Sequence, residues 1–343
     1  MSLQWNDKVF GVKEENFEAL ALEVFRFQAE NNPVYSDFLK ALKVEPARVS
    51  QITQIPFLPV RFFKSHEIKT TDPIAIGFEA QAVFESSGTT GSVNSRHFVK
   101  DLLLYEESFT KGFELTYGPI NQYCIIGLLP SYLEKGNSSL VYMVDKLVRL
   151  SEHPQSGFYL NDPIAIGFEQ LAVVLQELEK RKQPTLLIGV TFALLDFAER
   201  FSFSLEHAIV METGGMKGRR KEMIRPEVHE KLKNAFAVPV IHSEYGMTEL
   251  LSQAYSKGDG IFNCPSWMKV LMRDEEDPFL VSMPRFQTVA SISGTINIID
   301  LANIWSCSFI ATDDVGKLNA DESFEVLGRV DGSDLRGCSL MVV

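Results

Sequence analysis

The sequence is poor in cysteine and lacks any long apolar run. Its 343 residues include 4 cysteines, at positions 124, 264, 307 and 338, and no two of them form a Cys-x-x-Cys pair. Neither a zinc site nor a disulfide framework is therefore indicated. No apolar run reaches the roughly 18 residues of a membrane helix, and no basic stretch followed by an apolar one opens the chain. We expect a cytoplasmic protein with reduced thiols and no integral membrane segment.

Basic charge is also scarce. The chain holds 33 lysine and arginine residues against 45 aspartate and glutamate residues, which gives a formal net charge of −12. This excess of acidic residues argues against a nucleic-acid partner. A hydrophobic content of 45% with 23% charged residues is instead typical of a globular protein, and the length suits one large or two ordinary domains.

Short apolar strands alternate with longer helical patterns through the middle of the chain. Strands are predicted at 123–129, 185–189, 207–211 and 238–241. Helices are predicted near 14–30, 35–42, 102–113, 138–150, 170–181, 192–201 and 221–236. This alternation predicts an α/β fold with a buried parallel sheet flanked by helices. From about 255 the pattern changes to alternating strands, at 295–300 and 305–311, which predicts a small β subdomain within 255–327.

One octapeptide, Asp-Pro-Ile-Ala-Ile-Gly-Phe-Glu, occurs twice. It spans 72–79 and again 162–169. The flanking sequences differ and no fixed period continues, so the duplication does not indicate a repeat architecture.

A stretch rich in glycine, serine and threonine follows the apolar residues 82–84. It reads Glu-Ser-Ser-Gly-Thr-Thr-Gly-Ser from Glu85 to Ser92. The glycines permit tight turns, and hydroxyls with free N–H groups that face one point form an anion cradle. No Gly-Lys-Ser/Thr closes the stretch, so it is not the P-loop of ordinary nucleotidases. The alternative is a polar surface loop.

The order Ser-Ser-Gly-Thr-Thr-Gly resembles the phosphate-binding loop of the adenylate-forming superfamily, which includes acyl-CoA ligases and luciferases. This resemblance implies that the loop binds the β- and γ-phosphates of ATP. The residues concerned are Ser86, Ser87, Gly88, Thr89, Thr90 and Gly91.

The sequence Tyr-Gly-Met-Thr-Glu at 245–249 resembles the adenine and magnesium motif of the same superfamily. On that resemblance Tyr245 and Gly246 lie against adenine and Thr248 bonds the α-phosphate. Glu249 would hold Mg²⁺, a cation that takes one or two carboxylates together with phosphate oxygens. The alternative is a strand-to-helix turn whose threonine and glutamate cap a helix.

Three further segments match the superfamily in order. Gly214 and Gly215 resemble its adenine-side loop. Asp314, in Thr-Asp-Asp-Val-Gly, falls on the aspartate that binds both ribose hydroxyls, and a carboxylate suits paired hydroxyls because it only accepts hydrogen bonds. Arg329, in Gly-Arg-Val-Asp-Gly, resembles the hinge arginine that reaches ribose or phosphate.

The end of the sequence departs from the usual superfamily pattern. The lysine expected after the glycine-rich loop is absent, and only 14 residues follow Arg329, so we expect no mobile C-terminal lid domain. A cysteine near the end, Cys338, makes the chain similar to the LuxE-like acyl-protein synthetases. That family activates a fatty acid as acyl-AMP, carries it as a thioester on such a cysteine and passes it to a fatty-acid reductase or other acceptor protein.

The resemblance therefore implies an adenylate-forming large domain at 1–327, followed by a hinge-like tail at 328–343. It implies an acid–thiol ligase that uses ATP and Mg²⁺, with Cys338, Thr248, Glu249 and Arg329 as catalytic residues. Two alternatives stay open: a phenylacetate-type CoA ligase without its lid, and a nucleotide-binding pseudoenzyme that acts as a scaffold. Cys124 and Cys307 lie in apolar strands and are expected in the core.

Overall fold

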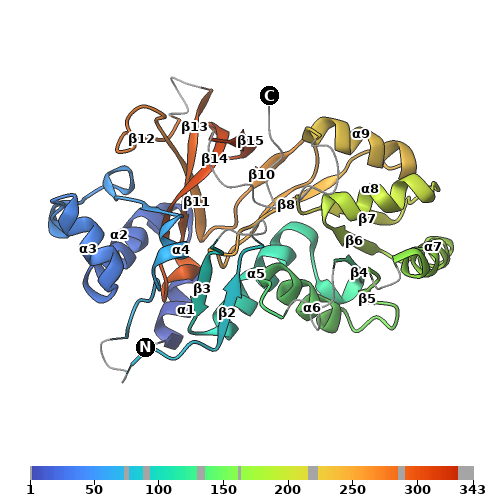
Figure 1. The fold of residues 1–343 in the computed structure, drawn as a ribbon, viewed down its shortest axis with the longest axis horizontal. Coiled ribbons are helices and arrows are strands. Elements are labelled where there is room, and N and C mark those ends of the chain that lie inside the picture. The colour runs from blue at the N-terminus through green and yellow to red at the C-terminus, as the bar shows by residue number, and fades with distance from the viewer. Residues whose placement is uncertain are drawn as a thin grey trace. The chain divides into compact units, whose positions relative to one another are not determined.

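The computed structural model describes residues 2–72, 77–87, 93–129, 136–160, 164–214, 223–284 and 290–330. Within these ranges the chain forms two compact units, and Figure 1 labels many of their helices and strands. The first unit contains the described residues up to Phe109, Met247–Gln253 and the described residues from Asn263 onward. The second contains those within Thr110–Gly246 and Ala254–Phe262.

An antiparallel sheet forms the centre of the first unit. Its strands lie in the order β12 (Val281–Ser282), β11 (Met268–Arg273), β13 (Ser291–Asp300), β14 (Phe309–Asn319) and β15 (Phe324–Arg329). The two-residue strand β1 (Leu58–Pro59) pairs in parallel with β14. The prediction of alternating strands in the last hundred residues is confirmed, although the second of them begins at Phe309 and not at 305.

Helices cover one face of this sheet through an aromatic cluster. The helices of the first unit are α1 (Ser2–Phe10), α2 (Glu14–Asn31), α3 (Pro33–Ala41) and α4 (Phe62–Ser65), with short 3₁₀ turns η1 (Pro46–Arg48), η2 (Ile52–Gln54) and η4 (Leu301–Asn303). The ring of Phe309 on β14 contacts Phe25 of α2 and Tyr35 of α3, with centroids 5.9 and 6.3 Å away. Buried aromatic pairs of this kind dominate core energetics.

A two-stranded hairpin, β2 (Ala82–Glu85) with β3 (Arg96–Val99), also belongs to the first unit. Helix α5 (Leu102–Tyr117) follows it, as predicted, and runs from the first unit into the second. The glycine-rich stretch is therefore the connection of an antiparallel hairpin.

The second unit contains the predicted parallel sheet. Strands β5 (Gly157–Phe158), β4 (Cys124–Leu128), β6 (Thr185–Gly189), β7 (Ala208–Glu212) and β8 (His242–Tyr245) lie side by side in that order and run parallel. Strand β9 (Ala254–Ser256) pairs antiparallel with β8, and β10 (Ile261–Asn263) follows it in the chain. Every residue of β4 and β6 is buried, which is typical of a parallel sheet covered on both faces.

Helices pack on both faces of this sheet (Figure 1). They are α6 (Ser139–Ser151), α7 (Ile164–Lys180), α8 (Thr191–Arg200) and α9 (Arg225–Phe236), with the 3₁₀ turn η3 (Ile120–Gln122). Phenylalanines of α7, α8 and α9 join one core with Ile126 and Leu128 of β4. Gly127 points to the opposite face, where a Cβ would lie 3.1 Å from Val144 of α6 and 2.9 Å from the Phe158 ring. Among the described residues no helix is long and apolar enough to cross a membrane.

The prediction of a strand at 238–241 is wrong, because β8 begins only at His242. Pro239 has no N–H for a ladder hydrogen bond, so a parallel strand is disfavoured at that point. Tyr245, the first residue of the Tyr-Gly-Met-Thr-Glu motif, is the last residue of this strand.

Candidate functional site

The base of the glycine-rich connection is closed by two hydrogen bonds. The N–H of Ser86 donates to the carbonyl of Ser95 (3.0 Å), and the N–H of Ser95 donates to Oγ of Ser86 (2.9 Å). Ser87 is exposed next to this closure. The other four residues of the predicted phosphate loop, Gly88, Thr89, Thr90 and Gly91, lie outside the described residues.

Thr248 and Glu249 lie in a tight turn between β8 and β9. The N–H of Leu250 donates to the carbonyl of Met247 at 3.1 Å, so Thr248 and Glu249 occupy the two central positions of a β-turn. Residues 250–253 form no helix, so the alternative in which these residues cap a helix is wrong. Glu249 is fully buried and Thr248 is half-buried.

The main chain of this turn is bound by buried side chains of the first unit. His97 Nδ1 donates to the Thr248 carbonyl at 2.8 Å, and Asn303 Nδ2 donates to the Glu249 carbonyl at 2.7 Å. His97 Nε2 lies 3.0 Å from Asn303 Oδ1. Burial lowers the pKa of His97, although its contacts with Thr248, Glu249 and Asn303 oppose that shift. None of this was visible in the sequence, because the three segments lie far apart in it.

The predicted ribose and phosphate residues Asp314 and Arg329 face each other across β14 and β15. Their Cα positions are partners in the ladder, and Arg329 Nε lies 3.2 Å from Asp314 Oδ1. The guanidinium also lies 3.5 Å from Asp313 Oδ2. The Arg329 side chain is only 4% exposed and that of Asp314 only 9%. Two residues that were predicted from separate motifs are thus brought into one ion pair.

In the second unit, Glu212 organises the loop that carries Gly214. Its Oε2 accepts hydrogen bonds from the Gly214 N–H at 2.6 Å and from Thr191 Oγ1 at 3.2 Å. Its Oε1 lies 3.4 Å from Arg225 Nε and 3.6 Å from His229 Nε2. Burial would raise the pKa of Glu212, but the His229 and Arg225 partners lower it to about 2. Gly214 has a φ of +73°, which glycine adopts without strain. Gly215 lies outside the described residues.

A second buried carboxyl group, that of Glu244, lies on the neighbouring strand β8. Burial and the nearby negative charge of Glu212 raise the pKa of Glu244 to about 8. Glu244 is therefore protonated at neutral pH, whereas Glu212 is ionised. Neither residue was predicted from the sequence. The one signal that the sequence offered for them was a glutamate at the end of a predicted strand.

Tyr245, the predicted adenine contact, is buried at the end of β8. Its ring packs edge-on against Phe262, with centroids 5.9 Å apart. Gly246 follows it and is also buried. At the start of the same strand, His242 Nδ1 lies 3.2 Å from the Tyr117 hydroxyl. Burial and the charge of Lys257 lower the pKa of His242 to about 4, so this ring is neutral at physiological pH.

The donor set at Glu249 fits magnesium only together with phosphate. Within the described ranges, no group of three or more His, Cys, Asp or Glu side chains is placed to hold a metal ion. Mg²⁺ does not require such a cage, because it commonly binds through one or two carboxylates, substrate phosphates and water. A single buried carboxylate is compatible with that mode.

The described cysteines are buried or half-buried, and none forms a disulfide. Cys124 and Cys307 lie in the core, as predicted, and burial raises their thiol pKa values to about 11 and about 12. Burial also raises the pKa of the half-buried Cys264 well above its usual range, and nearby Glu322 and Asp300 add to the shift. Cys338, the predicted acyl acceptor, lies outside the described residues.

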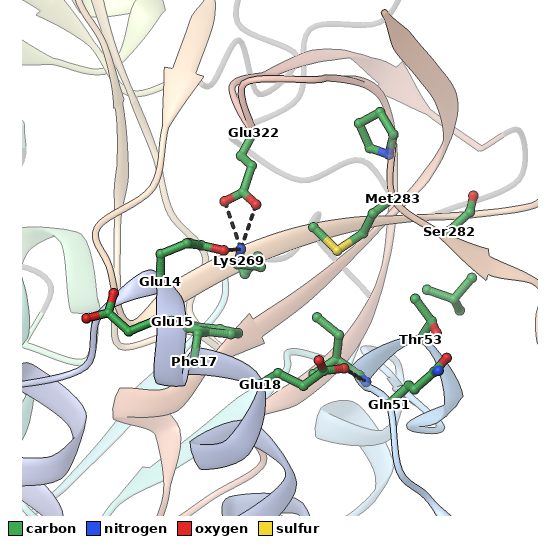
Figure 2. A pocket seen from close by; sticks show the side chains of 13 residues that line it. Glu14, Glu15, Phe17, Glu18, Gln51, Thr53, Lys269, Ser282, Met283 and Glu322 are labelled. Carbon is green, nitrogen blue, oxygen red and sulfur yellow. Dashed lines mark hydrogen bonds and ion pairs between the residues drawn. The ribbon is translucent and has the colours of Figure 1, made fainter. Parts of the chain in front are cut away.

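A cavity of about 530 Å³ in the first unit has the wrong charge for a carboxylate or phosphate (Figure 2). Among the described residues, its lining includes Glu14, Glu15, Glu18 and Glu322 and one basic residue, Lys269. The figure shows Lys269 Nζ between two of them, 2.8 Å from Glu14 and 2.7 Å from Glu322. None of the described residues predicted for the site lines this cavity. We therefore do not assign it to the nucleotide or the acyl group.

A family model of LuxE acyl-protein synthetases matches residues 4–343. The chain therefore belongs to the LuxE acyl-protein synthetase family, and the resemblance predicted from the motifs is confirmed. No curated protein sequence gives a significant match.

Solved structures similar to the chain include three enzymes. A luciferase-like enzyme from the mealworm Zophobas morio is 16% identical, with 77% of this chain and 61% of that chain covered and a TM-score of 0.49. A long-chain-fatty-acid–CoA ligase from Archaeoglobus fulgidus is 17% identical (72% and 51% covered, TM-score 0.46). O-succinylbenzoate coenzyme A synthetase from Bacillus subtilis, in complex with ATP and magnesium ion, is 15% identical (78% and 56% covered, TM-score 0.44).

The chain thus spans about half to three fifths of the length of these structures. Their TM-scores are too low to transfer the role of any residue. The mixed α/β class that the alternation of strands and helices predicted is seen directly in the strands and helices of the two units.

Proposed function

We propose that this protein activates a carboxylic acid with ATP, as acyl-AMP, and then transfers the acyl group to a protein thiol. Membership of the LuxE acyl-protein synthetase family over residues 4–343 is the observation that carries the proposal. The substrate we favour is a fatty acid, and the final acceptor is a partner protein such as a fatty-acid reductase or a carrier.

In the first half-reaction a carboxylate oxygen of the substrate attacks the α-phosphorus of ATP. The bond from the α-phosphorus to the bridging oxygen breaks, and pyrophosphate leaves with the electron pair. A carboxylic acid with a pKa near roughly 4 is already ionised at neutral pH, so no general base is needed. The protein then has to align the reactants and neutralise charge.

Residues of the first unit are assigned to these tasks. Hydroxyl groups of Ser86 to Thr90 and N–H groups of Ser87 to Gly91 would bind the β- and γ-phosphates, and Thr248 would bond the α-phosphate. Glu249 would hold Mg²⁺, which supplies charge neutralisation at the phosphates when it is bound. Asp314 would accept hydrogen bonds from the ribose hydroxyls. Arg329 would orient the Asp314 carboxylate through the 3.2 Å ion pair.

Residues of the second unit are assigned to the adenine base. Tyr245 offers a flat aromatic face, and Gly246, Gly214 and Gly215 would allow the base to approach the main chain closely. Glu212 supports this assignment, because its 2.6 Å contact fixes the Gly214 amide.

In the second half-reaction the thiol of Cys338 would attack the carbonyl carbon of acyl-AMP. The carbon–oxygen bond to phosphate breaks, AMP leaves, and the thiol proton passes to solvent. The acyl group is then held as a thioester, which keeps it activated for a second transfer to the partner protein.

The test uses the full-length protein with ATP, Mg²⁺ and a series of radiolabelled acids of increasing chain length. After denaturing electrophoresis, we expect label on the wild-type chain that neutral hydroxylamine removes, as for a thioester. Cys338→Ala should carry no label yet retain acid-dependent exchange between ATP and pyrophosphate. Cys264→Ala is the matched control and should be labelled like wild type, because its thiol is half-buried with a raised pKa.

Other outcomes point to the alternatives. Label on added coenzyme A, with none on protein, would identify a CoA ligase. Nucleotide binding without any acid-dependent exchange would identify a pseudoenzyme that acts as a scaffold.

A further inference from the structure

The turn that carries Thr248 and Glu249 is fixed by three buried side chains that no motif includes. We propose that His97, Asn303 and Asp300 are positioning residues, which hold the main chain of 248–252 so that Thr248 and Glu249 meet the phosphates and the metal ion. The inference rests on the function proposed above for those two residues.

The carbonyl side of the turn is held by His97 and Asn303. Two consecutive carbonyls, of Thr248 and Glu249, accept hydrogen bonds of 2.8 and 2.7 Å from these side chains. His97 Nε2 and Asn303 Oδ1 are also 3.0 Å apart, and this nitrogen donates to that oxygen only when both ring nitrogens carry a proton. These hydrogen bonds use the main chain of Thr248 and Glu249 and not their side chains. Removing either partner is therefore expected to shift the turn without altering the groups that meet the ligand.

The amide side of the same segment is held by Asp300, at the end of β13. Its Oδ2 accepts hydrogen bonds from the N–H groups of Leu251 at 2.8 Å and Ser252 at 3.0 Å. Its Oδ1 accepts one from Ser252 Oγ at 2.6 Å. His97, Asn303 and Asp300 thus bind four main-chain groups within five residues, in a segment that belongs to no helix or strand.

The residues that bind the turn are themselves anchored. Gln28, fully buried in α2, donates to the carbonyls of Asn303 at 3.1 Å and Ile304 at 2.9 Å. The hydrogen-bond path therefore runs from a long helix through η4 to the turn. Functional side chains must be held to within about 0.5 Å for efficient chemistry, and supporting residues of this kind supply that precision. A displacement of about 1 Å costs about 100-fold in rate.

The variants are Asn303→Ala and His97→Ala, with Asn32→Ala as the matched control. Asn32 is equally buried in the same unit, and its Nδ2 also donates to a main-chain carbonyl, that of Ser306, at 2.8 Å. Its other side-chain hydrogen bonds, within the described chain, join Thr70 and Tyr35 and not the turn. Each variant is assayed by thermal unfolding, by kcat and KM for ATP in acid-dependent pyrophosphate exchange, and by titration with Mg²⁺.

We expect Asn303→Ala and His97→Ala to lower kcat or the apparent Mg²⁺ affinity by about 10- to 100-fold, the usual effect of losing a residue that orients a metal ligand. Asn32→Ala should lower the melting temperature by a similar amount and leave kcat and Mg²⁺ affinity within about 2-fold of wild type. If an alanine variant does not fold, His97→Asn and His97→Gln are compared in its place. The asparagine amide keeps a donor for the Thr248 carbonyl, so His97→Asn should retain more activity than His97→Gln.

Equal losses in the Asn32 and Asn303 variants would overturn the positioning role while leaving the proposed function standing. So would Mg²⁺ affinities and kcat values that do not change in either test variant. A wild-type protein that shows neither exchange nor Mg²⁺-dependent ATP binding would overturn both proposals together.

Discussion

Two buried glutamates on neighbouring strands take opposite charge states because their partners differ. Glu212 and Glu244 lie on β7 and β8, which run parallel. Glu212 has Arg225 and His229 beside it, and its pKa falls to about 2. Glu244 instead has Glu212 as its charged neighbour, and its pKa rises to about 8. One ionised and one protonated carboxyl group therefore coexist on adjacent strands at neutral pH.

The raised pKa of Glu244 predicts that stability falls as pH rises. Unfolded, this carboxyl has a pKa near 4.5, so between 4.5 and about 8 the native state binds the extra proton. The free energy of unfolding should then lose up to about 1.4 kcal/mol per pH unit in that window. Glu244→Gln should flatten this slope in urea unfolding between pH 5 and 8, whereas the exposed control Glu230→Gln should keep it. An unchanged slope in Glu244→Gln would contradict the assignment.

Glu212 should act in the opposite direction. Its native pKa of about 2 lies below the ordinary value of 4.5, so its stabilisation is present above 4.5 and lost as the pH falls toward 2. The two effects fall in different pH windows. Because Asp300 and His242 also titrate with shifted pKa values below about 6.5, the Glu244 contribution is the difference in slope between wild type and Glu244→Gln.

The buried ion pair between Arg329 and Asp314 predicts a large cost for removing one partner. Arg329→Met leaves a buried carboxylate without this cation and should lower the free energy of unfolding by about 3 kcal/mol. Adding Asp314→Asn should restore part of that loss. Arg149→Met is the control, because Arg149 pairs with Asp145 on the surface of α6, with a side chain 73% exposed, and should cost less than about 0.5 kcal/mol. Denaturant unfolding of these variants and of Asp314→Asn alone measures these differences, and additive losses in the double variant would contradict the coupling.

At the scale of elements, the two copies of the octapeptide adopt different local structures. In the second copy, residues 164–169 open α7, and Phe168 is fully buried in the core. In the first copy, Gly77 has a φ of +80°, and the described residues 77–81 that lead to β2 form no helix. The downstream sequences differ, since an apolar helical pattern continues the second copy and a strand pattern continues the first. The flanking sequence, and not the octapeptide itself, therefore selects the conformation.

The strength of the hydrophobic period separates the predictions that succeeded from those that failed. Strands β4, β6 and β7 and helices α2, α5, α6, α8 and α9 were predicted within a few residues, because their period is strong. The strand at 238–241 failed because Pro239 removes a ladder donor, which outweighs a short apolar run. The motifs identified Asp314 and Arg329, which the β14–β15 register brings together. His97, Asn303 and Asp300 carry no local signal, since only the fold brings them to Thr248.

The C-terminal end of α9 predicts a stabilising glycine. Ala237 follows the helix with a φ of +49°, a left-handed conformation that costs alanine more than glycine, and its side chain is exposed. Ala237→Gly should raise the free energy of unfolding by about 0.5 to 1 kcal/mol. The same change two residues earlier, Ala235→Gly, lies inside the helix and should instead lower it by about 1 kcal/mol. Thermal unfolding measures both, and a loss at position 237 would contradict the prediction.

At the scale of the whole molecule, nucleotide binding should appear as a gain in stability. A ligand at about 100 times its Kd stabilises the native state by about 2.7 kcal/mol, which corresponds to roughly 5 °C in Tm for a chain of this size. We expect this shift with ATP and Mg²⁺ together, and a smaller one when EDTA removes the metal ion. In Glu249→Gln, the part of the Tm shift that depends on Mg²⁺ should be lost. A shift in Glu249→Gln that remains fully Mg²⁺-dependent would rule out Glu249 as the metal ligand.

The protonation state of the described cysteines has a practical consequence for labelling. Cys124 and Cys307 are buried with pKa values of about 11 and about 12, and the pKa of Cys264 is also raised, so few of these thiols are ionised near pH 7. Maleimides and iodoacetamides react with the thiolate, and the folded protein should therefore give a low background from these three positions. A fluorophore attached at Cys338, or at a cysteine introduced on the surface, can then be read without first removing the native cysteines.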